Sequence, residues 1–523
     1  MAILNQRSST PALRDSAGVR EAALTVLFFS LLAFNIWRTM HHAMWRDEMQ
    51  IYLLGAYNPS LSDLFHYLRY EPHPDLWHAL VWLGARVYAH PASMQVIHIL
   101  LAACVWLLIW RASPFRTADK ILLLLSYFLF WEYFVVSRQY VLVALAGFAF
   151  VAVRALRPQR MLLSFILLGV LANTMVFARI WSMVAAARLA LERNGPASMR
   201  FAGISLYLIC LAAAVAGMVP APDNVTYDPY LRFNPSDLSS LGLIPSGALL
   251  PVNPRWLAQA AGFLLHPGGG LPLFWNPNPF GQILALAHGD IARTLVTLGF
   301  LVAPPLVCWA LVRDWKLAAE FTLAYLGIVV FAGLWNYPGL SRQHGIVFVA
   351  LVCAVWMANA RAPLSGWRAA GWRLLLVISA IGGLLTLISE TRVFSHGRTV
   401  AEWLTRNRLA DAFIMGSRDT TLSTISGYLG RPLYYLECEC FGRFIVWNTM
   451  RTQFIDAAEI ARRVNRTPLA EGGRETILIT NREIPVEVAR ETAPNRTLTL
   501  LESFTRAEVE SENYWVFRVT PKS

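Results

Sequence analysis

Long apolar runs alternate with short polar segments up to about residue 390. The first run, AALTVLFFSLLAFNIW at 22–37, is long enough with its flanks to cross a bilayer. Similar windows of roughly 17–20 residues recur along the chain and predict about eleven membrane spans. The pattern therefore predicts an α-helical polytopic membrane protein. We centre the spans on 22–39, 94–110, 120–136, 139–153, 161–178, 180–192, 202–219, 291–312, 317–334, 345–360 and 373–389.

From about residue 390 the pattern changes, because charges return and helix-like segments alternate with strand-like ones. We expect helices at VAEWLTRNR, TLSTISGYLG and AAEIARRV, and strands at AFIMG, PLYYLE, TILIT, LTLLESF and YWVFRVT. This alternation predicts a small α/β domain with a mainly parallel sheet. We divide the chain into a transmembrane domain, 1–389, and an extracytoplasmic α/β domain, 390–523. The second domain has no GxGxxG, P-loop or HExxH motif, so we expect it to cap the site or position an acceptor rather than to catalyse.

Composition supports a membrane protein, because 56% of residues are hydrophobic and only 15% are charged, against about 25% charged in soluble domains. The net charge of +12 is spread over short loops and does not indicate nucleic-acid binding. The positive-inside rule then places the N-terminus and the basic loops in the cytoplasm. The loops 40–93 and 220–290 and the region after 390 fall outside, and no small-residue cleavage site follows the first span. The basic loops carry Arg111, Arg116 and Lys120; Arg154, Arg157 and Arg160; Arg193 and Arg200; Arg313 and Lys316; Arg361, Arg368 and Arg373.

The six cysteines do not form a recognisable framework. Four of them lie in apolar runs, where we expect small core side chains. Cys438 and Cys440 form a CEC segment in the C-terminal domain. A disulfide across one residue would be strained, so we expect thiols there.

Polar side chains concentrate in the first external loop, in WRDEMQ (45–50) and YEPHPDLWHALVWL (70–83). A carboxylate of Asp47 or Glu48 at the membrane interface could deprotonate an acceptor while a lipid-embedded donor is held beside it. An ordinary solvated acidic pair is the alternative. The second segment contributes Glu71, His73 and His78, and its Asp75 could cap an interfacial helix that follows.

The two segments together resemble the GT-C glycosyltransferases, which include the protein O-mannosyltransferases and the aminoarabinose transferase of lipid A. The shared features are an acidic pair directly after the first span, here in WRDE (45–48), and a proline element before an interfacial helix, here EPHPDL (71–76). The resemblance implies that Asp47 is the catalytic base and that Glu48 neighbours it in the site. Glu71 falls where aminoarabinose-transferase-like members keep an acidic residue.

The resemblance covers roughly the first 110 residues, and beyond them only the topology and a few external motifs match. Asp75 stands where the mannosyltransferases have the second proline of HPPL. The sugar and the acceptor therefore stay open.

Basic residues at the external ends of spans are not expected from the positive-inside rule, so they indicate a specific role. Arg138 in SRQY, Arg342 with His344 in SRQH, and Arg179 in VFARIW lie at such corners. Guanidinium groups grip phosphate bidentately, so we expect these residues to bind the phosphate of a polyprenyl-phosphate sugar. Snorkelling to lipid headgroups or pairing with Glu132 is the alternative.

A divalent metal is possible but not required by the sequence. Glu71, His73 and His78 could donate ligands, and Asp47 with Glu48 could hold a cation, yet the spacing matches no closed site. The long loop 220–290 is rich in Pro, Gly, Asn and Tyr. We expect it to cover the donor or acceptor, with an interfacial helix at 255–265.

The sequence thus favours an inverting glycosyltransferase of a bacterial inner membrane, with its active site on the periplasmic face. Its partners would be a polyprenyl-phosphate sugar donor, membrane lipids, and a glycan, lipid or protein acceptor. A transporter or flippase of lipid-linked sugars is one rival, although internal repeats are limited to the SRQ echo. A non-catalytic polysaccharide-assembly protein is another.

Overall fold

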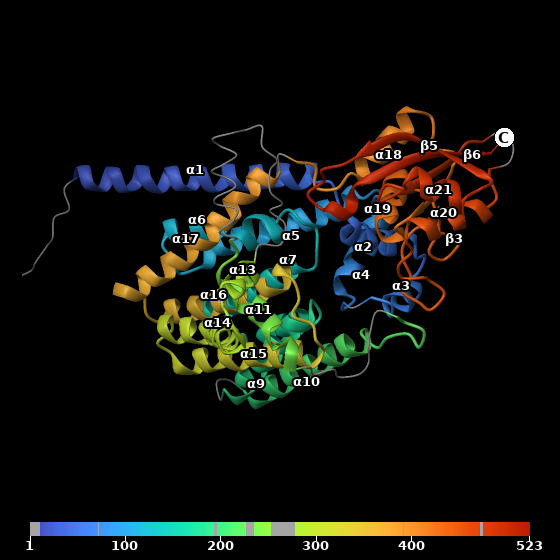
Figure 1. Cartoon of the computed structure of the whole chain (residues 1–523). Helices are drawn as coiled ribbons and strands as arrows, with labels where there is room; N and C mark the ends of the chain where they lie inside the picture. The colour runs from blue at the N-terminus through green and yellow to red at the C-terminus, as the bar shows by residue number, and fades with distance from the viewer. Residues whose placement is uncertain are drawn as a thin grey trace, which may run out of the picture.

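A helical body and a C-terminal sheet domain make up the chain in this computed structural model (Figure 1). The C-terminal domain lies at one end of the body, beside the short helices of the first loop (Figure 1). The structure describes residues 11–71, 73–192, 196–225, 235–252, 278–390, 392–470 and 474–522.

Seven helices among the described residues are long and apolar enough to cross a membrane. They lie in α1, α5, α10, α14, α15, α16 and α17, while α7 and α8 are shorter apolar helices. The expected α-helical polytopic membrane protein is therefore confirmed, and the number of eleven spans stays a prediction. The helices of the body are α1 (Pro11–His41), α5 (Ala92–Ala112), α6 (Thr117–Leu124), α7 (Tyr140–Leu156), α8 (Met161–Ala172), α9 (Val176–Leu191), α10 (Ala197–Ala216), α14 (Asp290–Leu311), α15 (Trp315–Leu334), α16 (Ser341–Arg361) and α17 (Gly366–Ser389).

Two of the expected spans are interrupted. The span expected at 120–136 is not one helix, because α6 ends at Leu124 and a short π-helix, η1 (Phe128–Glu132), follows. The span expected at 161–178 ends early at Ala172. The amide of Asn173 there donates to the carbonyls of Gly169 and Cys210, both at 2.9 Å. The side chain of Asn173 thus satisfies the Gly169 carbonyl in the last turn of α8 and links α8 to α10, and α9 starts afresh at Val176.

The loops 40–93 and 220–290 contain short helices. The first loop folds into α2 (Arg46–Tyr57), α3 (Leu61–Leu68) and α4 (Leu76–Val87). Asp75 stands at the N-cap of α4 but its side chain makes no capping hydrogen bond, so the expected cap is wrong. The long loop contains η2 (Pro235–Gly242), α11 (Leu243–Leu249) and α13 (Phe280–Ala285). The interfacial helix expected at 255–265 lies outside the described residues.

Helix α16 is the central element of the body. Nearly all of its side chains are buried, and it packs against α7, α11 and α15. Its first turn follows Gly339, whose φ of 72° suits a residue without a side chain. The side chain of Gln343 then accepts the backbone N–H of Leu340 at 2.9 Å. This start of α16 fixes the position of Arg342 at the end of the body.

The C-terminal domain contains a six-stranded sheet in the order β3-β2-β1-β4-β6-β5. Only β1 with β2 and β1 with β4 are parallel, while the other three ladders are antiparallel. The expected mainly parallel sheet is therefore wrong, because β3 pairs back on β2 and β5 on β6 without a crossover helix, and β6 also adds antiparallel to β4. The strands are β1 (Phe413–Ser417), β2 (Leu433–Tyr435), β3 (Cys440–Gly442), β4 (Thr476–Thr480), β5 (Arg496–Phe504) and β6 (Tyr514–Pro521).

Helices cover both faces of this sheet. Ile414 and Ile477 point to one face, where α18 (Gly397–Arg406) and α19 (Asp419–Leu429) pack. Met415 and Leu478 point to the other face, where α20 (Ala457–Arg466) and α21 (Val486–Thr492) pack. The alternation of side chains along each strand explains both cores.

Cys438 and Cys440 form a disulfide, so the expected pair of thiols is wrong. Glu439 between them has a φ of 52° and turns the chain sharply. The turn brings the two Cα atoms to 5.2 Å, within the range that disulfides require. The bridge lies in the turn between β2 and β3.

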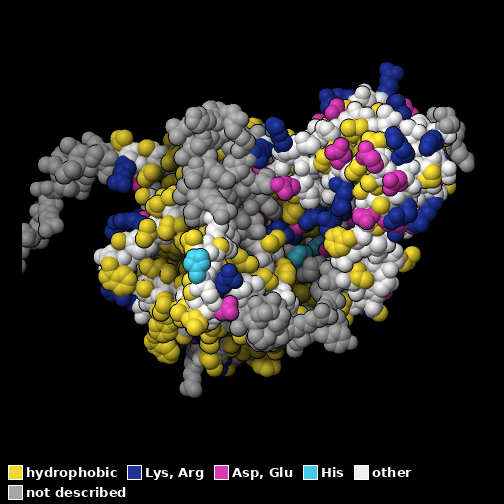
Figure 2. All heavy atoms as spheres, in the orientation of Figure 1, with side chains coloured by type: hydrophobic (Ala, Val, Ile, Leu, Met, Phe, Trp, Pro, Cys, Tyr) yellow, Lys and Arg dark blue, Asp and Glu magenta, His cyan; other side chains and the backbone are white. Residues whose placement is uncertain are grey.

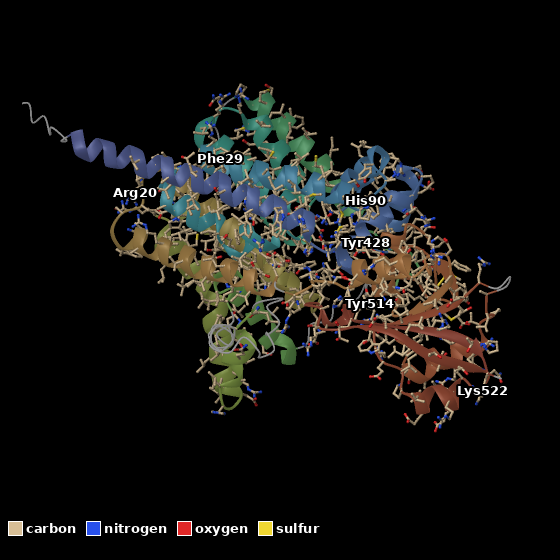
Figure 3. All side chains as sticks on the ribbon, turned by 90° about the horizontal axis from the view of Figure 1, so that it is seen from above. Arg20, Phe29, His90, Tyr428, Tyr514 and Lys522 are labelled. Atoms are coloured by element: carbon tan, nitrogen blue, oxygen red, sulfur yellow. A yellow bond between two sulfur atoms is a disulfide. The ribbon has the colours of Figure 1, made fainter. Side chains whose placement is uncertain are left out.

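The C-terminal domain contacts the first loop through specific hydrogen bonds. The side chain of Gln50 donates to the carbonyl of Ile445 at 2.8 Å and accepts its N–H at 2.9 Å. The backbone N–H of Met44 donates to the hydroxyl of Tyr428 at 2.9 Å, which lies where the helical body meets the domain (Figure 3). Because α19 also packs against α2, the domain is held close to the acidic pair of the first loop.

Candidate active site: an arginine-rich cavity at the end of the membrane helices

A cavity of about 270 Å³ lies between the end of the helical body and the C-terminal domain. Figure 2 shows Lys, Arg and His side chains gathered in the hollow between these two parts. Four arginines and two carboxylates line the cavity, so basic groups are in excess. The lining residues are Arg46, Asp47, Gln50, Ile51, Glu71, His73, Arg138, Tyr337, Arg342, Gln343, Arg418, Thr420, Ile445 and Trp447.

Asp47 is the centre of the charge network. Its Oδ2 accepts hydrogen bonds from Nη1 of Arg138 at 2.8 Å and from Nη2 of Arg342 at 3.1 Å. Its Oδ1 lies 3.5 Å from Nε of Arg46. The structure thus brings together Asp47, Arg138 and Arg342, three residues that the sequence placed in one site from segments almost 300 positions apart.

The ionisation of Asp47 follows from these contacts. Burial acts to raise the pKa of Asp47, but the charges of Arg138, Arg342 and Arg46 outweigh it and hold that pKa well below its ordinary value. Asp47 is therefore charged in the free site and is a weak base there. Its basicity depends on how strongly the arginines stay bound to it.

Glu48 faces away from the cavity and its side chain is fully buried. Its Oε1 accepts the backbone N–H of Ser137 at 2.6 Å. Its Oε2 lies 2.9 Å from Nε2 of His42 and accepts the backbone N–H of Trp45 at 3.4 Å. Glu48 therefore connects the end of α1, the start of α2 and the corner that carries Arg138.

Glu71 lies in the same cavity as Asp47. Its Oε1 accepts a hydrogen bond from the amide of Gln50 at 2.7 Å, the amide that also contacts Ile445. Burial raises the pKa of Glu71 to about 7, and the charge of Asp47 adds to this, against the hydrogen bond from Gln50. A carboxyl group with a pKa near neutrality suits proton transfer.

His73 and His78 are buried beside the network but do not complete a metal site. Nε2 of His73 lies 3.5 Å from Nη2 of Arg138, and burial together with the Arg138 charge lowers the pKa of both histidines. No group of three or more His, Cys, Asp or Glu that could hold a metal occurs in the described part of the chain. With an arginine beside His73 and an amide on Glu71, these side chains do not fit a divalent cation as they are arranged.

Two of the basic residues expected to bind phosphate lie elsewhere. The guanidinium of Arg179 donates to the carbonyls of Ala172 and Ala214, near the ends of α8 and α10, at 3.2 and 2.7 Å. His344 is buried, and its Nε2 lies 2.8 Å from the carbonyl oxygen of Pro338. Both side chains are used for helix ends and turns, and neither lines the cavity.

Sequence reasoning assigned no role to several residues of the cavity. Arg46 belongs to the WRDE segment, so its place beside Asp47 was a readable signal. Arg418, Thr420 and Trp447 belong to the C-terminal domain, for which no contact with the first loop could be inferred from local pattern. Tyr337 precedes SRQH and lies in the cavity wall. Its hydroxyl accepts a hydrogen bond from the side-chain amide of Gln343 at 3.1 Å.

The chain is similar in structure to ArnT from Cupriavidus metallidurans in the apo state, with a TM-score of 0.43 and 12% identity over 96% of this chain and 98% of that one. It is also similar to the arabinofuranosyltransferase AftD from Mycobacteria, with a TM-score of 0.40 and 12% identity, covering 95% of this chain and 40% of AftD. No protein-family model and no curated protein matches the chain. The functional assignment therefore depends on the residues of this chain.

Proposed function

We propose that this integral membrane protein is a GT-C-type glycosyltransferase that moves a sugar from a polyprenyl-phosphate donor to an acceptor at the periplasmic face of a bacterial inner membrane. The observation that carries the proposal is Asp47 held by Arg138 and Arg342 in a cavity at the end of the membrane helices. The carboxylate supplies a proton acceptor, and the paired guanidinium groups suit a phosphate. The resemblance of segments 45–48 and 71–76 to GT-C enzymes favours the same chemistry.

Donor binding would change the charge balance around Asp47. A phosphate that enters between Arg138 and Arg342 takes over hydrogen bonds that these arginines now donate to Asp47 Oδ2. The new negative charge and the weakened ion pairs both raise the pKa of Asp47. Asp47 therefore becomes an effective base only after the donor has bound.

Transfer then proceeds as a direct displacement with inversion. An oxygen or nitrogen of the acceptor attacks the anomeric carbon and gives its proton to the Asp47 carboxylate. The bond from the anomeric carbon to the phosphate oxygen breaks, and the polyprenyl phosphate leaves with the electron pair. Arg138 and Arg342 stabilise the negative charge that develops on the leaving group.

Glu71 offers a second proton acceptor in the same cavity. Its pKa of about 7 suits this role already in the free site, whereas that of Asp47 does not. The two carboxylates give distinguishable pH dependences, because Glu71 titrates near neutrality and Asp47 does not.

The side of the membrane is part of the proposal. The external assignment of loop 40–93, made from the charge of the basic loops, supports a periplasmic position for Asp47. The disulfide of Cys438 with Cys440 supports the same side, since disulfides persist in oxidising compartments.

Transfer by the purified protein from a panel of polyprenyl-phosphate sugars tests the function, with the wild type compared with Asp47→Asn. We expect the variant to bind donor and to transfer about 10²–10⁴-fold more slowly. An equal rate would reject Asp47 as the base, and no binding of any polyprenyl phosphate would reject the phosphate site. A flippase would instead keep translocating lipid in the variant.

A further inference from the structure

The edge of the C-terminal sheet that faces the cavity is the edge at which α/β sheets bind ligands. β1 pairs in parallel with β2 on one side and with β4 on the other. The helix after β1, α19, covers one face, and α20 before β4 covers the other. The carboxyl end of β1 is therefore a topological switch point, where ligands bind in such sheets. Arg418 and Thr420 follow β1 directly and line the cavity.

The charges at this edge are not balanced. Asp419, the carboxylate next to Arg418 in sequence, accepts hydrogen bonds from Nε and Nη2 of Arg451. Asp47 is taken up by Arg138 and Arg342 at 2.8 and 3.1 Å.

Arg46 and Arg418 are less closely paired, although the charge of Asp419 acts on Arg418 and that of Glu512 on Arg46. Arg46 reaches Asp47 only at 3.5 Å. Arg418 makes no ion pair with any described residue, its buried Nε lacks a hydrogen-bond partner, and its guanidinium lies over the ring of Phe454 at 5.1 Å. Two guanidinium groups, one from each domain, thus line the cavity, and among the described residues no carboxylate oxygen forms an ion pair with either of them at less than 3.5 Å.

The side chain of Thr420 is independent evidence that an anion binds at this edge. Its side chain is buried, with 6% exposed, and its hydroxyl has no hydrogen-bond partner. It stands in the first turn of α19, an 11-residue helix whose N-terminal end favours anions. An unsatisfied buried hydroxyl costs free energy, and an anion in the cavity would accept its hydrogen bond.

We propose that Arg418, Thr420 and Arg46 form a second anion subsite, which holds a phosphate or carboxylate group of the acceptor. This inference rests on the proposed function, in which the donor phosphate occupies Arg138 and Arg342. Arg138 lies at the corner before α7 and Arg342 in the first turn of α16, at the end of the helical body, where a lipid phosphate would arrive. Arg418 and Thr420 extend from the domain outside the helical body, on the side open to a water-soluble or headgroup-borne acceptor.

The experiment uses the full chain, purified and saturated with undecaprenyl phosphate to fill the donor site. Binding of inorganic phosphate is followed by ³¹P line broadening, and binding of labelled acetate by ¹³C line broadening. We expect at least one of the two anions to bind to the loaded wild-type protein. Phosphate alone, acetate alone or both identifies the anionic group that the subsite accepts.

Arg418→Gln should weaken that binding about tenfold or more, the effect of losing a charged hydrogen-bond donor. Thr420→Val should weaken it about threefold, and Arg418→Lys should restore part of it because Lys keeps the charge but not the fork. The matched control is Arg518→Gln, which removes an arginine on the sheet that pairs with Glu475 at 2.7 Å away from the cavity lining. It should bind anions as the wild type does.

Equal anion binding in wild type and Arg418→Gln would overturn the subsite. A loss of undecaprenyl phosphate affinity in Arg418→Gln as large as that in Arg342→Gln would also overturn it, because the arginines would then form one site. The proposed function fails separately, if undecaprenyl phosphate binding is absent or does not depend on Arg342. In that case the Arg418 comparison on the unloaded protein still decides whether the subsite exists.

Discussion

Glu48 and Ser137 are joined by a hydrogen bond of 2.6 Å, from the backbone N–H of Ser137 to Oε1 of a fully buried carboxylate. The residue after Ser137 is Arg138, which donates to Asp47, the residue before Glu48. The two acidic neighbours therefore have different tasks. Asp47 faces the cavity, and Glu48 holds the corner that delivers the arginine to it.

Replacing Glu48 tests this positioning role. Glu48→Ala leaves the N–H groups of Ser137 and Trp45 without their acceptor and should lower the affinity for undecaprenyl phosphate about tenfold or more, because Arg138 loses its support. Glu48→Gln keeps an oxygen for Ser137 and should lose less. Glu475→Gln, an exposed carboxylate on the sheet, is the control. Normal donor affinity in Glu48→Ala would contradict the role.

The pH dependence of transfer separates the two carboxylates of the cavity. If Glu71 must be ionised, kcat/KM should rise with pH, with a slope of about one below pH 7, and level off above it, because burial raises the pKa of Glu71 to about 7. Glu71→Gln should remove this limb. Asp47→Asn should lower the rate at every pH and shift the limb to lower pH, because the charge of Asp47 contributes to the raised pKa of Glu71. A limb near pH 7 that survives in Glu71→Gln would assign it to another group.

Much of this architecture is readable from the sequence, for physical reasons. A membrane span needs a long apolar run whatever it packs against, so the body could be predicted from hydropathy. The first loop could be predicted to hold a site, because placing the carboxyl groups of Asp47 and Glu71 near a membrane costs free energy and usually reflects a function. The strands of the C-terminal domain, except β3, follow from short apolar segments bounded by polar ones.

The remaining features depend on tertiary contacts that local pattern does not encode. Arg138, Arg179 and Arg342 look alike as external arginines, yet only two reach the cavity, because Arg179 binds carbonyls at helix ends. The Cys438–Cys440 bridge depends on the conformation of Glu439. Arg418 is unremarkable in sequence, and only the docking of its domain on α2 brings it close to the like charge of Arg46.

Glu512 makes the contact between the domains sensitive to pH. Its buried carboxyl accepts the backbone N–H of Arg46 at 2.6 Å and the hydroxyl of Tyr514 at 3.2 Å. Burial raises the pKa of Glu512 to about 7, against its hydrogen bonds and the Arg46 charge. The folded protein therefore holds a proton that the unfolded chain releases near pH 4.5, and stability falls as pH rises from there to about 7.

The measurement is the melting temperature between pH 5 and pH 8, for wild type and Glu512→Gln. Glu512→Gln cannot ionise, so its melting temperature should fall less over this range than that of the wild type. The pH dependence of the free energy of unfolding should differ between the two by an amount on the order of 2–3 kcal/mol. Glu510→Gln, which alters a neighbouring exposed carboxylate, should follow the wild type. Parallel curves for wild type and Glu512→Gln would show that Glu512 does not carry the dependence.

The disulfide reports the side of the membrane on which the C-terminal domain lies. Cys438 and Cys440 are bridged and should not react with a membrane-impermeant maleimide on intact cells. After mild reduction both thiols should react, because the turn that carries them is largely exposed to solvent. Two added maleimides are expected, counted by mass spectrometry of the purified protein.

The double variant Cys438→Ser with Cys440→Ser is the control and should add none, since Cys308 and Cys353 are buried and the other two cysteines lie in apolar membrane helices. Labelling of the reduced wild type only after the cells are opened would place the domain in the cytoplasm. The periplasmic active site would then fail with it, because Asp47 and Arg418 line one cavity. A bridge that closes over a single residue constrains little of the unfolded chain, so the double variant should keep its melting temperature within a few degrees.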